Sequence, residues 1–228
     1  MKLAWQQIPS PVVSEIYCAT QFDGVVLDTE HGCYNNESLY SCIQVITARG
    51  KKCFIRLTEI NKTLIRLCLD AGVTGLIFST VESKQQAWDI FELCNYPSHG
   101  GRRGLGLIRQ NMWGEKDLVS DPPILIAQIE TVLGVENFDK ISSYGFDFYM
   151  IGPYDLSASL GVPGDFDNPL YKEALEKVLN KVDKKKMAAH IPKDVEENLN
   201  LYKGYGILAL GMDTTLLLEG SKEILRHA

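Results

Sequence analysis

Two acids and a histidine follow a buried apolar run near the start of the chain. In the stretch VVLDTEHG, residues 25–32, the hydrophobic residues end at Asp28, and Glu30 and His31 come directly after it. The chain has four histidines, and a histidine exchanges its proton near neutral pH, which makes His31 a candidate general base. A structural role is the commoner use of a single histidine, but the position behind two acids favours catalysis.

Other residues able to do chemistry also stand at the ends of apolar runs. Arg56 lies in CFIRL, Gln128 and Glu130 in ILIAQIE, and Asp155 just after DFYMIG. Glu130 and Asp155 offer oxygen ligands with no Cys or His pair at zinc spacing, which suits Mg²⁺, Mn²⁺ or a similar divalent ion. The alternative is that each acid is held in an ion pair or a helix cap. Arg56 keeps its charge and donates several hydrogen bonds, so it suits an enolate or a carboxylate.

Two further features bear on the type of reaction. The turn GPYD would present the backbone N–H groups of Tyr154 and Asp155 to an anion, although a bare surface turn is the alternative. No lysine follows any apolar run, because Lys2, Lys51, Lys52 and Lys186 precede them. Schiff-base chemistry needs a desolvated lysine, so we expect a metal-dependent reaction.

Short apolar runs alternate with amphipathic segments along the whole chain. The runs are rich in Ile, Leu and Val with little alternation, which is typical of parallel strands covered on both faces. We expect strands over residues 3–6, 24–28, 53–57, 75–79, 124–130, 147–152, 187–191 and 207–211. We expect helices between them over residues 36–50, 61–72, 82–96, 168–185 and 192–206. This rhythm predicts a single domain, residues 1–228, of the α/β class with a (β/α)₈ barrel fold. A doubly wound sheet is less favoured because no G-x-G-x-x-G follows the first strand.

In a barrel fold, the position of a reactive residue relative to its strand indicates whether it can belong to an active site. In such barrels the chemistry lies at the carboxyl ends of the strands. The candidate residues at or just beyond those ends are Trp5, Asp28, Glu30, His31, Arg56, Gln128, Glu130 and Asp155. We therefore expect them to share one rim of the barrel.

Composition excludes several classes of partner. The chain has 23 basic and 29 acidic residues, a net charge of −6, so nucleic acid is not an expected partner. No apolar run reaches the roughly 18 residues of a membrane span. The N-terminus has no apolar signal core, and the six cysteines form no C-x-x-C pair, so we expect reduced thiols and a cytoplasmic location.

Five segments resemble motifs of the HpcH/HpaI aldolase family. They are FDGVVLDTEHG, LCLDAGVTGLI, QIET, IGPYDLSASLG and LGMDTTLL, in the family's order from residue 5 to about residue 218. The family comprises class II pyruvate aldolases such as 4-hydroxy-2-oxoheptanedioate aldolase and 2-dehydro-3-deoxyglucarate aldolase. The resemblance implies a (β/α)₈ barrel with an exchanged terminal helix, assembled as a hexameric or trimer-based homo-oligomer. It also implies a divalent ion (Mg²⁺, Mn²⁺ or Co²⁺) and reversible cleavage of a 4-hydroxy-2-oxo acid into a small 2-oxo acid, such as pyruvate, and an aldehyde.

The resemblance also implies a role for each site residue. By this resemblance, Glu130 and Asp155 are metal ligands, and Gln128 with the backbone of Tyr154 and Asp155 binds the substrate carboxylate. Arg56 stabilises the enolate, and Trp5 lies beside pyruvate. His31 is the proton acceptor, and Asp70 is the acid that raises the basicity of this histidine. Asp70 falls at the end of the helix expected after the third strand, which should be far from His31. Either Asp70 reaches a histidine across a subunit interface, or the helix lies elsewhere than predicted.

One departure from the family leaves the reaction subtype open. Ser79 and Thr80 stand where the family usually has a proline–methionine pair after the fourth strand. The alternatives to an aldolase, in order, are a Claisen-type enzyme using a CoA thioester or a second oxo acid, a non-catalytic barrel that binds a 2-oxo acid, and a phosphate-handling barrel that uses GGRRGLG, residues 100–106.

Overall fold

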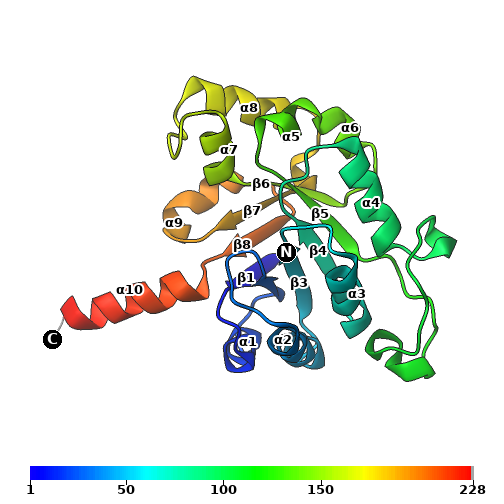
Figure 1. Cartoon of the computed structure of the whole chain (residues 1–228). Helices are drawn as coiled ribbons and strands as arrows, with labels where there is room; N and C mark the ends of the chain where they lie inside the picture. Colours follow the sequence, from blue (N-terminus) through cyan, green and yellow to red (C-terminus); the bar gives the residue numbers. More distant parts are fainter. Residues whose placement is uncertain (227–228) are drawn as a thin grey trace.

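The computed structural model describes residues 1–226, which form a closed barrel of eight parallel strands with helices around it (Figure 1). The strands pair in chain order and β8 pairs with β1. They are β1 (Lys2–Gln6), β2 (Gly24–Asp28), β3 (Lys52–Leu57), β4 (Gly75–Phe78), β5 (Ile124–Ile129), β6 (Phe148–Ile151), β7 (Met187–Ile191) and β8 (Ile207–Leu210). The predicted α/β class and (β/α)₈ barrel are confirmed, and each predicted strand end lies within one residue of its observed position.

Both faces of the strands are buried, which explains why their sequences do not alternate. Alternate residues point inward and form a core inside the barrel, which includes Leu3, Val26, Phe54, Ile77 and Ile126. The residues between them, with the apolar sides of the helices, form a larger core outside the barrel. Parallel strands covered by crossover helices have this two-sided burial.

The helices follow the strands around the outside of the barrel. They are α1 (Pro11–Cys18), α2 (Asn36–Ala48), α3 (Lys62–Ala71), α4 (Lys84–Cys94), α5 (Val132–Glu136), α6 (Phe138–Ser142), α7 (Pro153–Ser159), α8 (Pro169–Leu179), α9 (Val195–Asn198) and α10 (Asp213–Arg226). Asn61 accepts hydrogen bonds from the first turn of α3, and Gly72, at a left-handed φ of +88°, ends this helix. No helix within residues 1–226 has the length and hydropathy of a membrane span.

The helix predicted over residues 192–206 is wrong for most of its length. The segment forms α9, which has four residues, and then a 3-10 turn over Leu199–Tyr202. Asp194 before α9 has a left-handed φ of +49°, and no residue of either short helix is buried. Helices in proteins are stabilised largely by packing of an apolar face. Because the two short helices of this segment bury no residue, a longer helix is not stabilised here.

The last helix leaves the barrel instead of packing on it. In Figure 1, α10 projects away from the strands, with the chain terminus at its far end. Its side chains include five large apolar residues that are more than half exposed, Leu216, Leu217, Leu218, Ile224 and Leu225.

Candidate functional site

A cavity of about 340 Å³ opens at the carboxyl ends of the strands. Its walls include side chains that come from β1 to β3, from β5 and β6, and from the ends of β7 and β8. The lining residues are Trp5, Gln7, His31, Arg56, Gln128, Met150, Ile151, Gly152, Pro153, Tyr154, Asp155, His190, Pro192 and Met212. Except for Asp70 and Glu130, every predicted site residue lines this cavity, and Glu130 lies beside it, in contact with Gln128.

A buried ion pair joins β2 to β3 at this rim. Arg56 donates from Nε and Nη2 to the two oxygens of Asp28 at 2.8 and 2.7 Å, and its Nη1 lies 2.8 Å from Glu30. Trp5 and Gln7 each donate to Asp28 at 3.1 Å. Burial alone would raise the pKa of Asp28, but the hydrogen bonds and charge of Arg56, with the donors Gln7 and Trp5, lower it to about 2. Arg56 is thereby fixed in place at the cavity wall.

Glu130 is the buried acid on the opposite side of the rim. It is 3% exposed and accepts hydrogen bonds from the Thr80 hydroxyl, at 2.5 Å, and from the Gln128 amide. Its pKa is raised, chiefly by burial and further by the negative charges of Glu30 and Asp155, although the two hydrogen bonds oppose this. A carboxylate in this position is stabilised by any cation that binds near it.

Glu130 and Asp155, whose charges act on one another, offer carboxylate oxygens, the ligands that a hard divalent ion prefers. No group of three or more His, Cys, Asp or Glu side chains in residues 1–226 is arranged around a metal position, so water and substrate would supply the other ligands, as is usual for Mg²⁺. Gln128 Oε1 is buried without a partner among these residues, which leaves an acceptor beside Glu130. Gly152 keeps the space open, since a Cβ there would overlap the Glu130 carboxylate and lie 2.8 Å from its Cβ.

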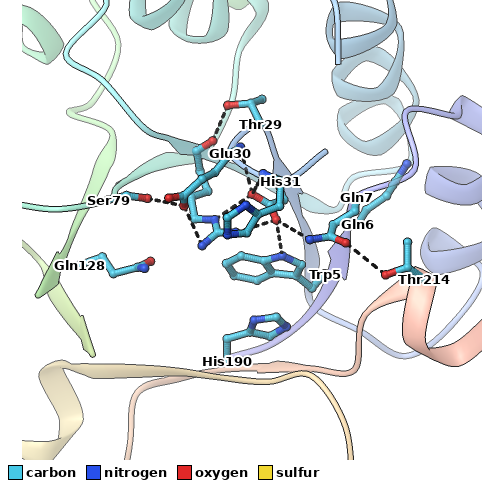
Figure 2. A network of polar contacts seen from close by, with 12 residues as sticks. Trp5, Gln6, Gln7, Thr29, Glu30, His31, Ser79, Gln128, His190 and Thr214 are labelled. Atoms are coloured by element: carbon cyan, nitrogen blue, oxygen red, sulfur yellow. Dashed lines mark hydrogen bonds and ion pairs between the residues drawn. The ribbon is translucent and has the colours of Figure 1, made fainter. Parts of the chain in front are cut away.

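The loop after β4 supplies hydroxyl groups to two of the acids. Ser79 donates to Glu30 at 2.7 Å (Figure 2), and Thr80 donates to Glu130. Thr80 has φ +53°, which is unfavourable for a β-branched residue and is characteristic of functional sites. The residues that depart from the family's proline–methionine pair therefore contact the acids of the site.

The remaining predicted residues lie at the mouth of the cavity. His31 is exposed in the turn after β2 and lines the cavity. Tyr154 and Asp155 are exposed in the first turn of α7, where backbone N–H groups lack helical partners. Their placement agrees with the expectation that these residues share one rim.

Trp5 offers little of its surface to the cavity. It is 1% exposed, and its ring stacks on His190 with centroids 4.0 Å apart and planes at 12° (Figure 2). The Arg56 guanidinium lies 5.0 Å from the same ring. Sequence reasoning missed His190 because it lies within a strand that reads as apolar, and its contact with Trp5 depends on the closed barrel.

Asp70 does not meet His31 within one chain. It lies near the end of α3, which returns to the amino-end rim, and it pairs with Arg103 at 3.1 Å. The predicted helix is correct, so a role for Asp70 toward His31 stays a prediction that requires a second copy of the chain.

The glycine-rich stretch 100–106 does not present free arginines. Arg103 is 4% exposed, bonds to Asp70 and Gln110, and lies 4.5 Å from the Tyr96 ring. Arg102 pairs with Glu92. These contacts argue against a phosphate site here.

Comparisons with known proteins agree with this fold and show the family. The sequence model of the family described as HpcH/HpaI aldolase/citrate lyase matches residues 3–220. A 2-keto-3-deoxy-L-rhamnonate aldolase of Klebsiella pneumoniae is 31% identical over 222 residues, which cover 93% of this chain and 82% of that protein. A 4-hydroxy-2-oxovalerate aldolase of Rhodococcus jostii is 30% identical over 221 residues, which cover 93% of this chain and 85% of the relative.

Solved structures have the same fold. A HpcH/HpaI aldolase/citrate lyase family protein of Burkholderia cenocepacia superposes with a TM-score of 0.89 at 24% identity, covering 100% of this chain and 93% of that one. The citrate synthase SbnG superposes with a TM-score of 0.83 at 26% identity, covering 99% of this chain and 91% of the other.

The buried ion pair predicts an acid-sensitive stability. Because the pKa of Asp28 is about 2 in the fold against 3.8 ordinarily, its contribution is present above about pH 4 and is lost as the pH falls toward 2, by about 2 kcal/mol. Denaturant unfolding between pH 2 and 5 measures this. Asp28→Asn should lack this part of the pH dependence and be less stable at pH 7, whereas Asp121→Asn, an exposed acid, should behave as wild type. An unchanged acid dependence in Asp28→Asn would contradict the assignment.

Proposed function

The chain belongs to the HpcH/HpaI aldolase/citrate lyase family, and from that premise we propose that it is a divalent-metal-dependent aldolase. The reaction is the reversible cleavage of a 4-hydroxy-2-oxo acid into pyruvate, or a similar 2-oxo acid, and an aldehyde. One observation carries the proposal: a fixed arginine, a histidine and Asp155 line one cavity at the barrel's carboxyl rim, and Glu130 lies beside it in contact with Gln128. The relatives named as aldolases, with about 30% identity over most of the chain, support it.

The binding roles follow from the donor set. Glu130 and Asp155 would hold the ion, which would supply a Lewis acid for the 2-oxo acid. The first-turn N–H groups of α7 at Tyr154 and Asp155 take the carboxylate, and Gln128 borders the same position. The cavity is within the range of sizes used for small ligands.

His31 and Arg56 act on the bond that breaks. His31 accepts the proton of the 4-hydroxyl group as the C3–C4 bond breaks, which releases the aldehyde and passes the electron pair to the C2 carbonyl as an enolate. Arg56 stabilises this negative charge, since three of its five N–H groups are bonded to Asp28 and Glu30 and two remain for the substrate. The enolate then takes a proton at C3 to give pyruvate.

A second candidate keeps the enolate and changes the electrophile. SbnG, at 26% identity, is a citrate synthase by name, and the Ser79–Thr80 pair stands beside the site. Condensation of acetyl-CoA with oxaloacetate is the assay for this Claisen-type candidate. Condensation of pyruvate with an aldehyde is the assay for the aldolase, and the two rates are compared.

We also propose that the chain acts as a homo-oligomer of the hexameric or trimer-based kind, in which α10 packs on a second copy. The large exposed leucines of this helix support this, because contiguous exposed apolar surface usually marks an interaction site. Figure 1 shows that α10 makes little contact with its own barrel.

The metal-dependent enolate chemistry predicts proton exchange without any aldehyde. With Mg²⁺ or Mn²⁺, the protein should exchange the methyl protons of pyruvate for deuterium, measured by NMR. EDTA should abolish the exchange, and Glu130→Ala should abolish it with metal present. Exchange that persists in both cases would rule out the metal assignment, and no exchange by the wild type would favour a non-catalytic barrel.

The space beside Glu130 gives a separate prediction. Gly152→Ala should displace the Glu130 carboxylate and weaken Mn²⁺ binding by about tenfold or more, since metal sites tolerate little displacement of their ligands. Electron paramagnetic resonance of free Mn²⁺ measures this directly. Gly104→Ala is the control, because a Cβ at Gly104 has nothing within 4 Å; equal affinities in the two variants would contradict the prediction.

The apolar face of α10 predicts a change of assembly. Leu217→Glu combined with Leu225→Glu should convert the oligomer to smaller species, measured by analytical ultracentrifugation of the full chain. Lys222→Glu, also on α10 and exposed, should keep the wild-type state. A monomeric wild type, or an unchanged oligomer in the double variant, would oppose this role of α10.

A further inference from the structure

The loop that follows β4 places a hydroxyl group on the buried acid Glu130. Thr80 is partly exposed, and its Oγ1 donates to Oε1 of Glu130 at 2.5 Å. The other oxygen of this carboxylate, Oε2, accepts a hydrogen bond from the side-chain amide of Gln128. Both oxygens of Glu130 are therefore held, one from the loop after β4 and one from within β5.

The backbone of Thr80 is held in an unfavourable conformation from both sides. Its φ of +53° lies in the left-handed region, which β-branched residues rarely adopt. The Ser79 N–H before it donates to the Leu57 carbonyl of β3 at 2.9 Å. The Val81 N–H after it donates to the Gln128 carbonyl of β5 at 3.1 Å. The strands on either side of β4 thus fix the loop, and a strained residue that its surroundings hold in this way is typical of a functional position.

The two hydrogen bonds leave Glu130 with lone pairs for a further ligand. An ionised carboxylate has about four lone-pair sites, and Thr80 and Gln128 use one on each oxygen. Glu130 is 3% exposed and has no basic partner among residues 1–226. The two donors therefore set the direction in which its remaining lone pairs point.

A side-chain donor in this loop distinguishes the chain from its family. The proline–methionine pair that the family usually has here carries no N–H or O–H in its side chains, whereas Thr80 supplies an O–H to Glu130. The barrel itself is shared with the solved structures of the family. The contact is thus not a requirement of the fold, which points to a role at Glu130.

We propose that Thr80 is a positioning residue whose hydroxyl group holds the Glu130 carboxylate in the orientation that binds the divalent ion. The inference rests on the proposed metal-dependent function and adds a residue outside the ligand set. A group that orients a metal ligand in this way usually raises metal affinity by about ten- to hundredfold. The strained backbone serves this role because it directs the hydroxyl group at Glu130.

The Mn²⁺ affinity of variants at Thr80 tests this, measured on the full-length protein without substrate by electron paramagnetic resonance of free Mn²⁺. Thr80→Val keeps the β-branched shape and loses the hydroxyl group, so it should weaken Mn²⁺ binding by about tenfold or more. Thr80→Ser keeps the donor and should recover most of the wild-type affinity. Thr80→Gly removes the hydroxyl group and the backbone strain together, so it should fold without strain and still bind Mn²⁺ weakly.

Thr47→Val is the matched control for the loss of one hydroxyl group. Thr47 is also partly exposed, and its hydroxyl donates to the Ile43 carbonyl at 2.7 Å within α2. This variant loses a hydrogen bond of the fold without touching Glu130, so its Mn²⁺ affinity should equal that of the wild type.

Wild-type Mn²⁺ affinity in Thr80→Val or in Thr80→Gly overturns the inference, and so does a Thr80→Ser variant that binds no better than Thr80→Val. In these cases a loss of Mn²⁺ binding in Glu130→Ala still supports the proposed metal site. Mn²⁺ binding that is absent in the wild type, or that does not depend on Glu130, overturns the metal site and the inference with it.

Discussion

The buried pair of Asp28 and Arg56 is the interaction on which the rim depends. Asp28 has no exposed surface and receives donors from β1, from the loop after β1 and from β3. Gln7, one of these donors, also accepts from Thr214, and its backbone bonds to Asp213 (Figure 2). One carboxylate therefore connects three consecutive strands to the start of α10. Removing one partner of such a buried pair costs about 3–5 kcal/mol, because the other charge remains buried.

The same pair sets the charge of the cavity. Arg56 is opposed by Asp28 and Glu30, and Glu130 and Asp155 add two more carboxylates that have no basic partner among residues 1–226. This rim therefore carries four acids and one fixed cation. The pKa of Glu130 is raised chiefly by burial and further by the negative charges of Glu30 and Asp155. A divalent ion at the proposed site of Glu130 and Asp155 would offset this negative charge.

The sequence predicted the barrel well because the signal for buried parallel strands is local. Ile, Leu and Val runs without alternation identified each strand, and the rule that barrel chemistry lies at carboxyl ends placed Arg56, Gln128 and Glu130 at one rim. The helix over 192–206 was wrong because helix formation there depends on packing that the sequence does not display. No role was predicted for His190 or Thr80 from the sequence, for a related reason. His190 stacks on the Trp5 ring, a contact that exists only in the closed barrel. Thr80 is distinguished by its backbone conformation. For Asp70 the helix was predicted correctly but the side-chain partner was not. This partner, Arg103, lies 33 residues further along the chain, so local sequence does not reveal the contact.

Thr80 shows how the fold holds the acids in place. A threonine at φ +53° is disfavoured by roughly 1–3 kcal/mol, so its surroundings must compensate. Its hydroxyl reaches Glu130 on the β5 side, while the hydroxyl of Ser79 reaches Glu30 on the β2 side. The loop after β4 therefore connects the acid that holds Arg56 to the acid expected to hold the metal. Residues at these two positions act on the geometry of both halves of the site, which is a physical reason why a change there would alter the reaction subtype while the barrel stays the same.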